Sequence, residues 1–355
     1  MAFKMSNNPY LHSIITSIRT VIIILLLTFS LLELALRVYN YFNPLMIFYD
    51  NSYNRFRGKP FANDFGFKLN SLGFKDVEFS HEKGQAYRIL GLGDSFAFGV
   101  VPYDNNYLTL LESGLQQKPA NVEVFNMGIP STGPKEYLSL LVREGLDYHP
   151  DMVLVSLFVG NDFLENIKAR KWYTYSYVTS FFHYAIALQR KYEHHAIHGE
   201  AQYCDDCANF TEDAYIKLEQ ERSFIFVPES PLFHLALDRV VEALVKIQEI
   251  CNKNGIKLVV LIIPDEVQIN PQLQSEVRQQ LATEGKGWNT TQPNEKLAEK
   301  IKAMNIDYLD LYPYFSEEAH KRQLYRPRDT HWNIAGNQFA ATIIKNHILH
   351  YLPFN

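Results

Sequence analysis

Apolar segments of strand length alternate with helical segments along most of this chain, and this alternation limits the possible folds more than any other feature. Two of the strand-like segments are apolar at nearly every position, which is typical of strands covered on both faces in a parallel sheet. The pattern predicts a parallel sheet of five strands with helices on both faces. The predicted strands cover residues 87–92, 122–125, 152–158, 257–263 and 306–311. The predicted helices cover residues 134–148, 231–254, 294–304 and 333–351.

The composition excludes several classes of protein. Hydrophobic residues make up 47% of the chain and charged residues 21%, which indicates a globular core and excludes a mainly disordered chain. A mean hydropathy of −0.18 excludes a protein with several membrane spans. The formal net charge of −5 gives no reason to expect nucleic acid as a partner. Three cysteines are too few for a disulfide scaffold of this size.

The most apolar stretch lies between Arg19 and Arg37 and is 17 residues long. This length is close to the lower limit for a helix that crosses a bilayer. Glu33 lies near one end of the stretch, where a carboxylate can reach the interface. A small-residue cleavage pattern does not follow, so residues 1–37 are predicted to be an uncleaved single-pass membrane anchor. A buried amphipathic helix is the alternative, and the flanking charges do not decide the orientation.

Composition also predicts how the rest of the chain is organised. Residues 38–86 are rich in aromatic residues, Gly and Asn, which predicts an irregular lead-in. The α/β pattern occupies residues 87–355. Within it, residues 162–230 separate two strands by more than a simple crossover requires, so we expect an inserted lid or subdomain there.

Polar residues follow several of the predicted strands. Ligands of open parallel sheets bind at the carboxyl ends of the strands, so residues in these loops are the candidates for a site. The candidates, in chain order, are Ser95 after the first strand, Gly128 after the second, Asn161 after the third, and Asp329 and His331 before the last helix.

These residue types are the parts that acyl transfer requires. A hydroxyl is a weak nucleophile until a base removes its proton, and an imidazole is suited to that task near neutral pH. A carboxylate fixes the tautomer of the imidazole, and N–H donors stabilise the oxyanion that develops on the substrate. Each residue alone has a structural explanation, such as a helix cap for Ser95 or a turn for Gly128. Asp94 is interpreted as a turn or cap residue. The joint position of the candidates at one sheet edge favours a catalytic site.

The same segments resemble the SGNH-hydrolase (GDSL esterase/lipase) family. The resemblance extends from about residue 87 to residue 351 and rests on Gly93-Asp-Ser-Phe96, Gly128, Asn161 in Gly-Asn-Asp, and Asp329-Thr-His331. It implies a flavodoxin-like three-layer α/β/α fold with a five-stranded parallel sheet, and no cofactor. It also implies the roles of the individual residues: Ser95 as nucleophile, His331 as base, Asp329 as the partner of the base, and the Ser95 N–H, the Gly128 N–H and the Asn161 side-chain amide as the oxyanion hole.

Two features depart from the usual pattern of the family. The acid commonly lies three residues before the histidine, whereas here that position is Arg328 and the acid is Asp329. This spacing resembles the Asp-x-His-Trp arrangement of the alginate-acetylation branch, in which acetyl groups move on and off exported polysaccharides. Gly160 also lies directly before Asn161, where family members commonly have one residue between.

The anchor adds to the resemblance. Glu33 and Arg37 form a Glu-x-x-x-Arg segment similar to that of bacterial members whose catalytic domain lies outside the plasma membrane. We therefore expect an extracytoplasmic catalytic domain held by a single N-terminal helix.

The insertion contains a second group of residues with chemical potential. His194 and His198 are four residues apart, and Cys204 and Cys207 follow as a CxxC pair. Such a set can hold zinc, although its spacing matches no zinc motif, and an oxidising compartment would favour a disulfide between the two cysteines. We expect no metal here. Cys251, in a predicted helix, is expected to be buried and inert.

Aromatic residues are concentrated in the same insertion, over residues 172–177 and 181–184. Three interpretations stay open: the core of a lid, the lining of a substrate cleft, or a contact with the membrane surface.

The sequence thus predicts a membrane-anchored serine esterase or O-acyltransferase that works through an acyl-Ser95 intermediate on an acylated glycan or lipid. The Asp-x-His resemblance favours a short acyl group, acetyl, on an envelope or exported glycan. One alternative is a lipase or lysophospholipase. An alternative of another class is a catalytically silent glycan-binding or scaffold protein on the same fold. The sequence does not determine how many chains assemble.

Overall fold

The computed structural model of the chain describes residues 9–42, 53, 57–116, 121–167, 176–189, 198–280 and 287–353. Internal contacts divide the chain into two units, one of residues 1–49 and 170–189 and the other of residues 50–169 and 190–355. The second unit therefore begins well before residue 87, where composition predicts the start of the α/β domain.

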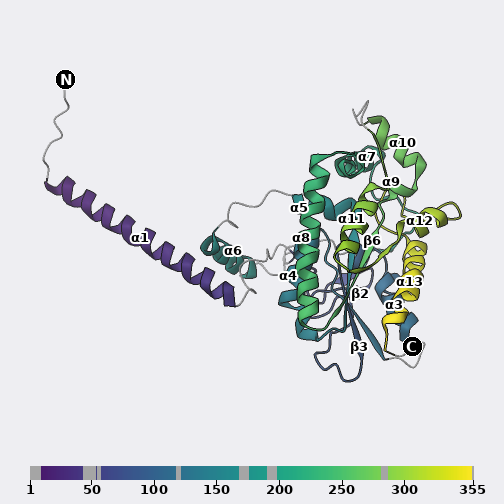
Figure 1. Ribbon diagram of the computed structural model, residues 1–355, viewed down its shortest axis with the longest axis horizontal. Coiled ribbons are helices and arrows are strands. Elements are labelled where there is room, and N and C mark those ends of the chain that lie inside the picture. Colours follow the sequence, from purple (N-terminus) through teal and green to yellow (C-terminus); the bar gives the residue numbers. More distant parts are fainter. Residues whose placement is uncertain are drawn as a thin grey trace. The chain divides into compact units, whose positions relative to one another are not determined.

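The described part of the first unit consists of two helices, α1 (Pro9–Phe42) and α6 (Tyr177–Gln189) (Figure 1). Residues 12–39 of α1 are long and apolar enough to cross a membrane, and this stretch is not buried inside the protein. Because this stretch is exposed, α1 is not the buried amphipathic helix that was the alternative interpretation of the segment.

The sheet of the second unit confirms the predicted fold. It contains five parallel strands in the order β4-β3-β5-β6-β7. The strands are β3 (Tyr87–Gly93), β4 (Val122–Asn126), β5 (Met152–Phe158), β6 (Lys257–Ile263) and β7 (Asp307–Asp310). Within the sheet, β3 comes first along the chain, β4 then pairs on one side of it, and β5, β6 and β7 follow on its other side. This reversal of direction creates a switch point at the carboxyl ends of β3 and β5, where ligands of such sheets bind.

Helices cover both faces of the sheet (Figure 1). They are α2 (Ser95–Phe98), α3 (Tyr107–Gln116), α4 (Pro134–Arg143), α5 (Val159–Ile167), α7 (Glu212–Arg222), α8 (Pro231–Lys253), α9 (Glu266–Ile269), α10 (Pro271–Gln280), α11 (Gln292–Ala303), α12 (Tyr312–Glu318) and α13 (Ile334–Ile348). Short 3₁₀ helices are η2 (Tyr103–Asn105), η3 (Gly145–Tyr148), η5 (Ser223–Phe226) and η6 (Leu349–Tyr351).

Successive side chains of each strand point to opposite faces of the sheet and pack against the helices there. One buried cluster joins α3 and α13 to the sheet and contains Ile89, Leu111, Leu154, Leu261 and Ile344. On the other face, α8 packs against α4, α5 and α11. Because neighbouring residues of a strand point to opposite faces, a strand between two helical layers must be apolar throughout, which explains the continuous apolar runs of β5 and β6.

The segment that precedes the sheet supports the loops at its carboxyl edge. It contains a small hairpin, β1 (Asn63–Asp64) and β2 (Phe67–Lys68), and then Lys75 and Asp76, which are both buried. Lys75 pairs with Asp64 and its Nζ donates to the Gly99 carbonyl at 2.8 Å, directly after α2. Asp76 accepts the backbone N–H of Asn126 at 2.7 Å, at the end of β4. Burial raises the pKa of Asp76 to about 7.

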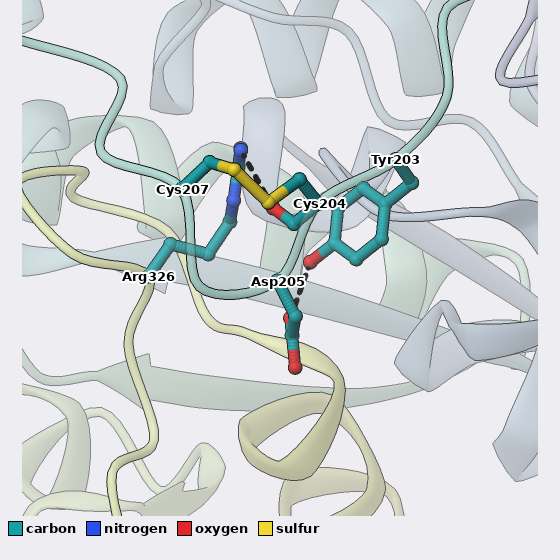
Figure 2. Close-up of a disulfide and its surroundings, with 5 residues drawn as sticks. All are labelled: Tyr203, Cys204, Asp205, Cys207 and Arg326. Carbon is teal, nitrogen blue, oxygen red and sulfur yellow. Dashed lines mark hydrogen bonds between the residues drawn. A yellow bond between two sulfur atoms is a disulfide. The ribbon is translucent and has the colours of Figure 1, made fainter.

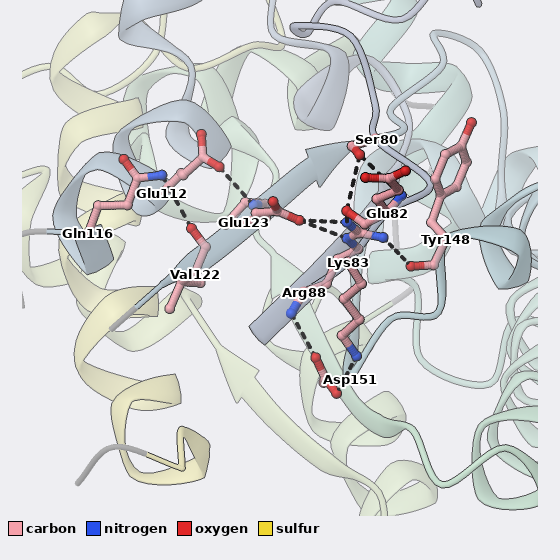
Figure 3. A network of polar contacts seen from close by, with 11 residues as sticks. Ser80, Glu82, Lys83, Arg88, Glu112, Gln116, Val122, Glu123, Tyr148 and Asp151 are labelled. Atoms are coloured by element: carbon pink, nitrogen blue, oxygen red, sulfur yellow. Dashed lines mark hydrogen bonds and ion pairs between the residues drawn. The ribbon is translucent and has the colours of Figure 1, made fainter. Parts of the chain in front are cut away.

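A network around Arg88 holds the opposite, amino-terminal edge of the sheet (Figure 3). The Arg88 side chain is fully buried, and its Nε and Nη2 donate to Glu123 Oε2 on the neighbouring strand at 2.9 and 2.7 Å. Its Nη1 donates to the carbonyl of Tyr148. The backbone N–H of Arg88 donates to Asp151, which also pairs with Lys83. A buried guanidinium is stable only when it is paired in this way, so the network aligns the starts of β3, β4 and β5.

Candidate active site

Ser95 lies at the sharp turn between β3 and α2. Asp94 caps α2, since its Oδ1 accepts the N–H of Phe96 at 2.9 Å, and Ser95 is the first residue of the helix. Asp94 itself is buried, and burial raises the pKa of its carboxyl group. The cap role expected for Asp94 is therefore confirmed, and it places the Ser95 side chain at the carboxyl edge of β3.

His331 and Asp329 reach Ser95 from the segment before α13. The distance from Ser95 Oγ to His331 Nε2 is 2.7 Å, and the distance from His331 Nδ1 to Asp329 Oδ1 is 2.6 Å. The structure thus brings the Ser95 hydroxyl to an imidazole and a carboxylate that follow it by more than 230 positions in the sequence. This order of contacts is the one that lets an imidazole accept the proton of a nucleophilic hydroxyl.

The short spacing between Asp329 and His331 is accommodated by a tight turn. Asp329 Oδ1 also accepts the backbone N–H of His331 at 3.1 Å, so one oxygen binds both the backbone and the ring of the same residue. Arg328, which occupies the position where the family commonly has its acid, has a φ of +46°. This left-handed conformation is unfavourable for a side chain as large as arginine, and such strain is frequent near functional sites.

The Asp329 carboxylate is buried and is held from its other side by Arg326. The Arg326 Nη1 donates to Asp329 Oδ2 at 2.9 Å. Burial alone raises the pKa of Asp329, but the hydrogen bond from His331 and the charges of His331 and Arg326 outweigh it and keep the pKa below its usual value. Asp329 is consequently ionised at neutral pH and can stabilise a protonated His331.

Arg326 is held in turn by a disulfide turn of the insertion (Figure 2). Its Nη2 donates to the Cys204 carbonyl at 3.3 Å, and its guanidinium lies 5.3 Å from the ring centre of Tyr203. Cys204 and Cys207 form a disulfide. Asp205, within the same turn, accepts the N–H of Ile334 at 3.0 Å, at the start of α13. The turn therefore packs against both ends of the segment that carries Asp329 and His331.

The two cysteines of the insertion form the disulfide that an oxidising compartment would favour, and not the zinc site that was the other possibility. The sulfurs of Cys204 and Cys207 are bonded to each other, so they are not thiolates that could bind a metal. His198 Nδ1 lies 2.8 Å from Asp64 Oδ1. His194 lies outside the described residues. Cys251 is buried, as expected.

Asn161 lies in the first turn of α5, directly after β5. Its Nδ2 donates to Asp94 Oδ2 at 3.3 Å, so the residue that caps α2 also orients this amide. The start of α5 is fixed by Asp162, which accepts the Phe158 N–H and the Tyr137 hydroxyl, both at 2.8 Å. Gly160 leaves no room for a side chain, because an added Cβ would lie 2.1 Å from Asp265 Oδ2.

Gly128 has a steric role that the sequence did not suggest. An added Cβ would lie 2.2 Å from the backbone nitrogen of Phe98, so only glycine allows the loop after β4 to approach α2. Its N–H donates to Asn126 Oδ1 at 2.9 Å. The expected oxyanion role of Gly128 therefore requires that this N–H be shared between Asn126 and the substrate, or that the Asn126 side chain move.

Sequence reasoning missed two side chains of this region. Arg326 stands three residues before Asp329 in an Arg-Pro-Arg run, and that proximity was the available signal. Tyr137 lies within a predicted helix and gave no signal, because its hydroxyl reaches Asp162 only through tertiary packing.

A serine–imidazole–carboxylate chain lies at the switch point of the parallel sheet, and this arrangement is suited to acyl transfer. Residues 232–354 match the family model described as the SGNH hydrolase-like domain of the acetyltransferase AlgX. This confirms the resemblance to the SGNH family and its alginate-acetylation branch. The matched segment contains Asp329 and His331, whereas Ser95, Gly128 and Asn161 precede it. The site and this match together indicate an enzyme that acts on ester bonds.

Several solved structures are similar to this chain at low sequence identity. An acetyl xylan esterase is 14% identical with a TM-score of 0.42, covering 74% of this chain and 99% of its own. A putative acylhydrolase from Bacteroides fragilis is 13% identical with a TM-score of 0.43, covering 77% and 92%. A lipase/acylhydrolase from Enterococcus faecalis is 14% identical with a TM-score of 0.41, covering 76% and 98%. Among curated proteins, none matches the chain.

Proposed function

We propose that this protein is a membrane-anchored serine esterase or O-acyltransferase that removes or transfers short acyl groups, acetyl above all, on an envelope or exported glycan. The observation that carries the proposal is the continuous chain from Ser95 Oγ through His331 to Asp329, with distances of 2.7 and 2.6 Å. The match of residues 232–354 to the AlgX acetyltransferase domain supports acetyl as the group, and a glycan as the substrate class is what the Asp-x-His-Trp resemblance implies.

The first half of the reaction forms an acyl-enzyme. Ser95 Oγ attacks the ester carbonyl carbon while its proton passes to His331 Nε2. Asp329 stabilises the imidazolium, and the Ser95 N–H and the Asn161 amide stabilise the oxyanion, with the Gly128 N–H where it is shared. Collapse of the tetrahedral intermediate breaks the bond to the leaving alkoxide, which takes the proton from His331. The acyl group is then bound to Ser95 Oγ.

The second half transfers the acyl group to water or to a sugar hydroxyl. The acceptor loses its proton to His331 as its oxygen attacks the acyl carbon, and Ser95 recovers that proton as the bond to Oγ breaks. With water the product is a carboxylic acid, and with a sugar hydroxyl it is a new ester. Both outcomes use the same residues.

Two further observations support an extracytoplasmic catalytic domain. The apolar stretch of residues 12–39 is long enough to cross a membrane once. A disulfide between Cys204 and Cys207 persists in oxidising compartments and is rare in the cytosol.

The test is an ester-hydrolysis assay of the full chain in detergent with nitrophenyl acetate and nitrophenyl palmitate. We expect the acetate to be preferred, and Ser95→Ala to lower kcat by at least about 10³-fold. Ser275→Ala, on α10, is the matched control and should keep full activity. A glycan oligosaccharide added as acceptor will distinguish transfer from hydrolysis by the ester that forms.

Each alternative gives a different result. A preference for palmitate would favour a lipase or lysophospholipase. Activity that survives in Ser95→Ala would contradict the mechanism. A folded wild-type chain that hydrolyses neither ester and does not react with a fluorophosphonate probe would favour a silent glycan-binding protein on the same fold.

A further inference from the structure

Glu33 is a carboxylate within the apolar helix α1, where an unpaired charge would be costly. Arg37, one turn later, donates to Glu33 Oε1 from Nε at 3.0 Å and from Nη2 at 2.7 Å. This pair satisfies one oxygen of the carboxylate from within the same helix.

The same carboxylate accepts three hydrogen bonds from the start of α6. The donors are the Ser176 hydroxyl at 2.8 Å and the backbone N–H groups of Tyr177 and Val178 at 3.1 and 3.0 Å. Ser176, the residue before α6, caps the helix in the usual way by accepting the Thr179 N–H at 3.3 Å. Glu33 adds a second cap from another helix, because it accepts the N–H groups of Tyr177 and Val178. The Arg37 guanidinium also lies 4.3 Å from the ring centre of Tyr177. The start of α6 is therefore fixed to α1 at the level of Glu33.

The position of Glu33 along α1 gives the depth in a bilayer at which α6 contacts α1. The apolar stretch ends at residue 39, six residues beyond Glu33. At about 1.5 Å per residue this is about 9 Å along the helix axis. In a helix that crosses a bilayer, such a point lies near the boundary between the headgroups and the acyl chains.

The α6 helix has the composition of a segment that contacts lipid. Its 13 residues, YVTSFFHYAIALQ, contain no Asp, Glu, Lys or Arg. Val178 is buried. Phe182 and Ile186, which are four positions apart and so share one face, are 55% and 52% exposed. A helix of this length, about 20 Å, is too short to span a bilayer but long enough to lie in its surface.

We propose that α6 is an interfacial membrane helix that lies at the headgroup–acyl boundary beside α1, with Phe182 and Ile186 inserted among the lipids. The partner is a lipid bilayer. Glu33 couples the two helices, because it lies near this boundary in α1 and binds the first residues of α6. The contacts of Glu33 with the start of α6 and the exposure of Phe182 favour membrane contact over a lid core for the aromatic residues that begin at position 181.

The experiment uses the full chain reconstituted in phosphatidylcholine–phosphatidylglycerol vesicles, with an environment-sensitive NBD label at Phe182→Cys or Ile186→Cys. Leu25→Cys, exposed in the middle of α1, is the positive control, and Glu249→Cys, exposed on α8, is the comparison in the other unit. We expect a blue-shifted emission at positions 182 and 186 and its loss with lipids that carry a nitroxide near the headgroup. Leu25→Cys should respond more to a nitroxide deep in the acyl chain.

Two outcomes would overturn the proposal. Water-like emission at both positions, with no quenching by either lipid, would show that α6 lies outside the bilayer. A blue-shifted emission that neither nitroxide lipid quenches would show that the helix is covered by protein, as a lid or by a second chain. Glu33→Gln in the labelled chain tests the coupling: we expect weaker quenching at position 186, and unchanged quenching would remove Glu33 from the proposal. Catalytic failure of the protein would affect none of these readouts.

Discussion

Asp329 Oδ1 accepts two hydrogen bonds from His331, one from the backbone nitrogen at 3.1 Å and one from ring Nδ1 at 2.6 Å. The backbone bond closes a turn over a single intervening residue, and this turn points the ring at the same oxygen. A spacing of two residues is therefore sufficient for the Asp–His contact. It leaves Asp329 Oδ2 available to Arg326.

Asp329→Asn should lower kcat by about 10⁴-fold, as for the corresponding change in other serine triads, because an amide does not hold the required tautomer or stabilise the imidazolium. KM for nitrophenyl acetate should change little. Steady-state kinetics with the wild-type chain in parallel will measure both constants. A kcat within tenfold of wild type would exclude Asp329 from the mechanism.

Arg326→Met should raise the pKa of Asp329, because it removes a positive charge that lowers it. Since catalysis requires the ionised carboxylate, the acid limb of the kcat–pH profile should move to higher pH. The folded Asp329 has a lowered pKa, so its stabilising contribution is present at neutral pH and is lost as the pH falls through that value.

The same variant leaves a buried carboxylate without its arginine, which should lower the free energy of unfolding by about 3 kcal/mol. Arg322→Met is the matched control, because Arg322 is exposed and its ion pair with Glu318 lies on the surface. Its effect on unfolding should stay within about 0.5 kcal/mol. Equal pH profiles for wild type and Arg326→Met would contradict a positioning role for Arg326.

Reduction of the disulfide by dithiothreitol yields two thiols and oxidised dithiothreitol. On the acid limb of the pH profile, where Arg326→Met lowers kcat, reduction should lower kcat by less than that variant does. The reason is that the turn holds Arg326 through the Cys204 carbonyl, whereas the contact between Arg326 and Asp329 can persist without it. Chain entropy for so short a loop accounts for about 2 kcal/mol of stability at most. The double variant Cys204→Ser, Cys207→Ser should behave like the reduced protein and be insensitive to dithiothreitol; a further decrease on treating it would locate the effect elsewhere.

Asn161→Ala should lower kcat by about 10²–10³-fold with little change in KM, because the amide acts on the oxyanion that forms after binding. Asn254→Ala, which removes an exposed amide after α8, is the control of the same chemistry and should leave kcat and KM unchanged. The measurement is again nitrophenyl acetate hydrolysis. If Asn161→Ala raises KM and leaves kcat unchanged, Asn161 binds the ground state and is no oxyanion donor.

Glu266→Gln should flatten the dependence of stability on pH. Burial raises the pKa of Glu266 from 4.5 to about 7 in the folded protein, so the folded state holds this proton more tightly than the unfolded state. The free energy of unfolding should therefore fall as the pH rises from about 4.5 to 7, by about 3 kcal/mol at most from this residue. Urea unfolding at pH 5 and pH 8 should show a smaller difference for Glu266→Gln than for wild type. A difference equal to that of the wild type would show that Glu266 does not titrate in this range.

The secondary structure and the outline of the site followed from local pattern. Strands buried on both faces must be apolar throughout, as β5 and β6 are, and helices over them must be apolar at helical spacing. These strands and the longer helices were therefore recognisable from the chain alone. Ser95, Asn161 and Asp329 were recognisable for a related reason. In a parallel sheet the residues after each strand meet at one edge, whichever strand they follow.

Contacts between distant segments set the remaining features. Asp94 orients Asn161, Asn126 takes up the N–H of Gly128, and the turn at Cys204 holds Arg326. The choice between a metal site and a disulfide, and the partner of Glu33, were also open until the fold brought these groups together. Periodicity reports only which side of an element is buried. A hydrogen bond depends on the distance and direction between two atoms, and these are set only when the whole chain has packed.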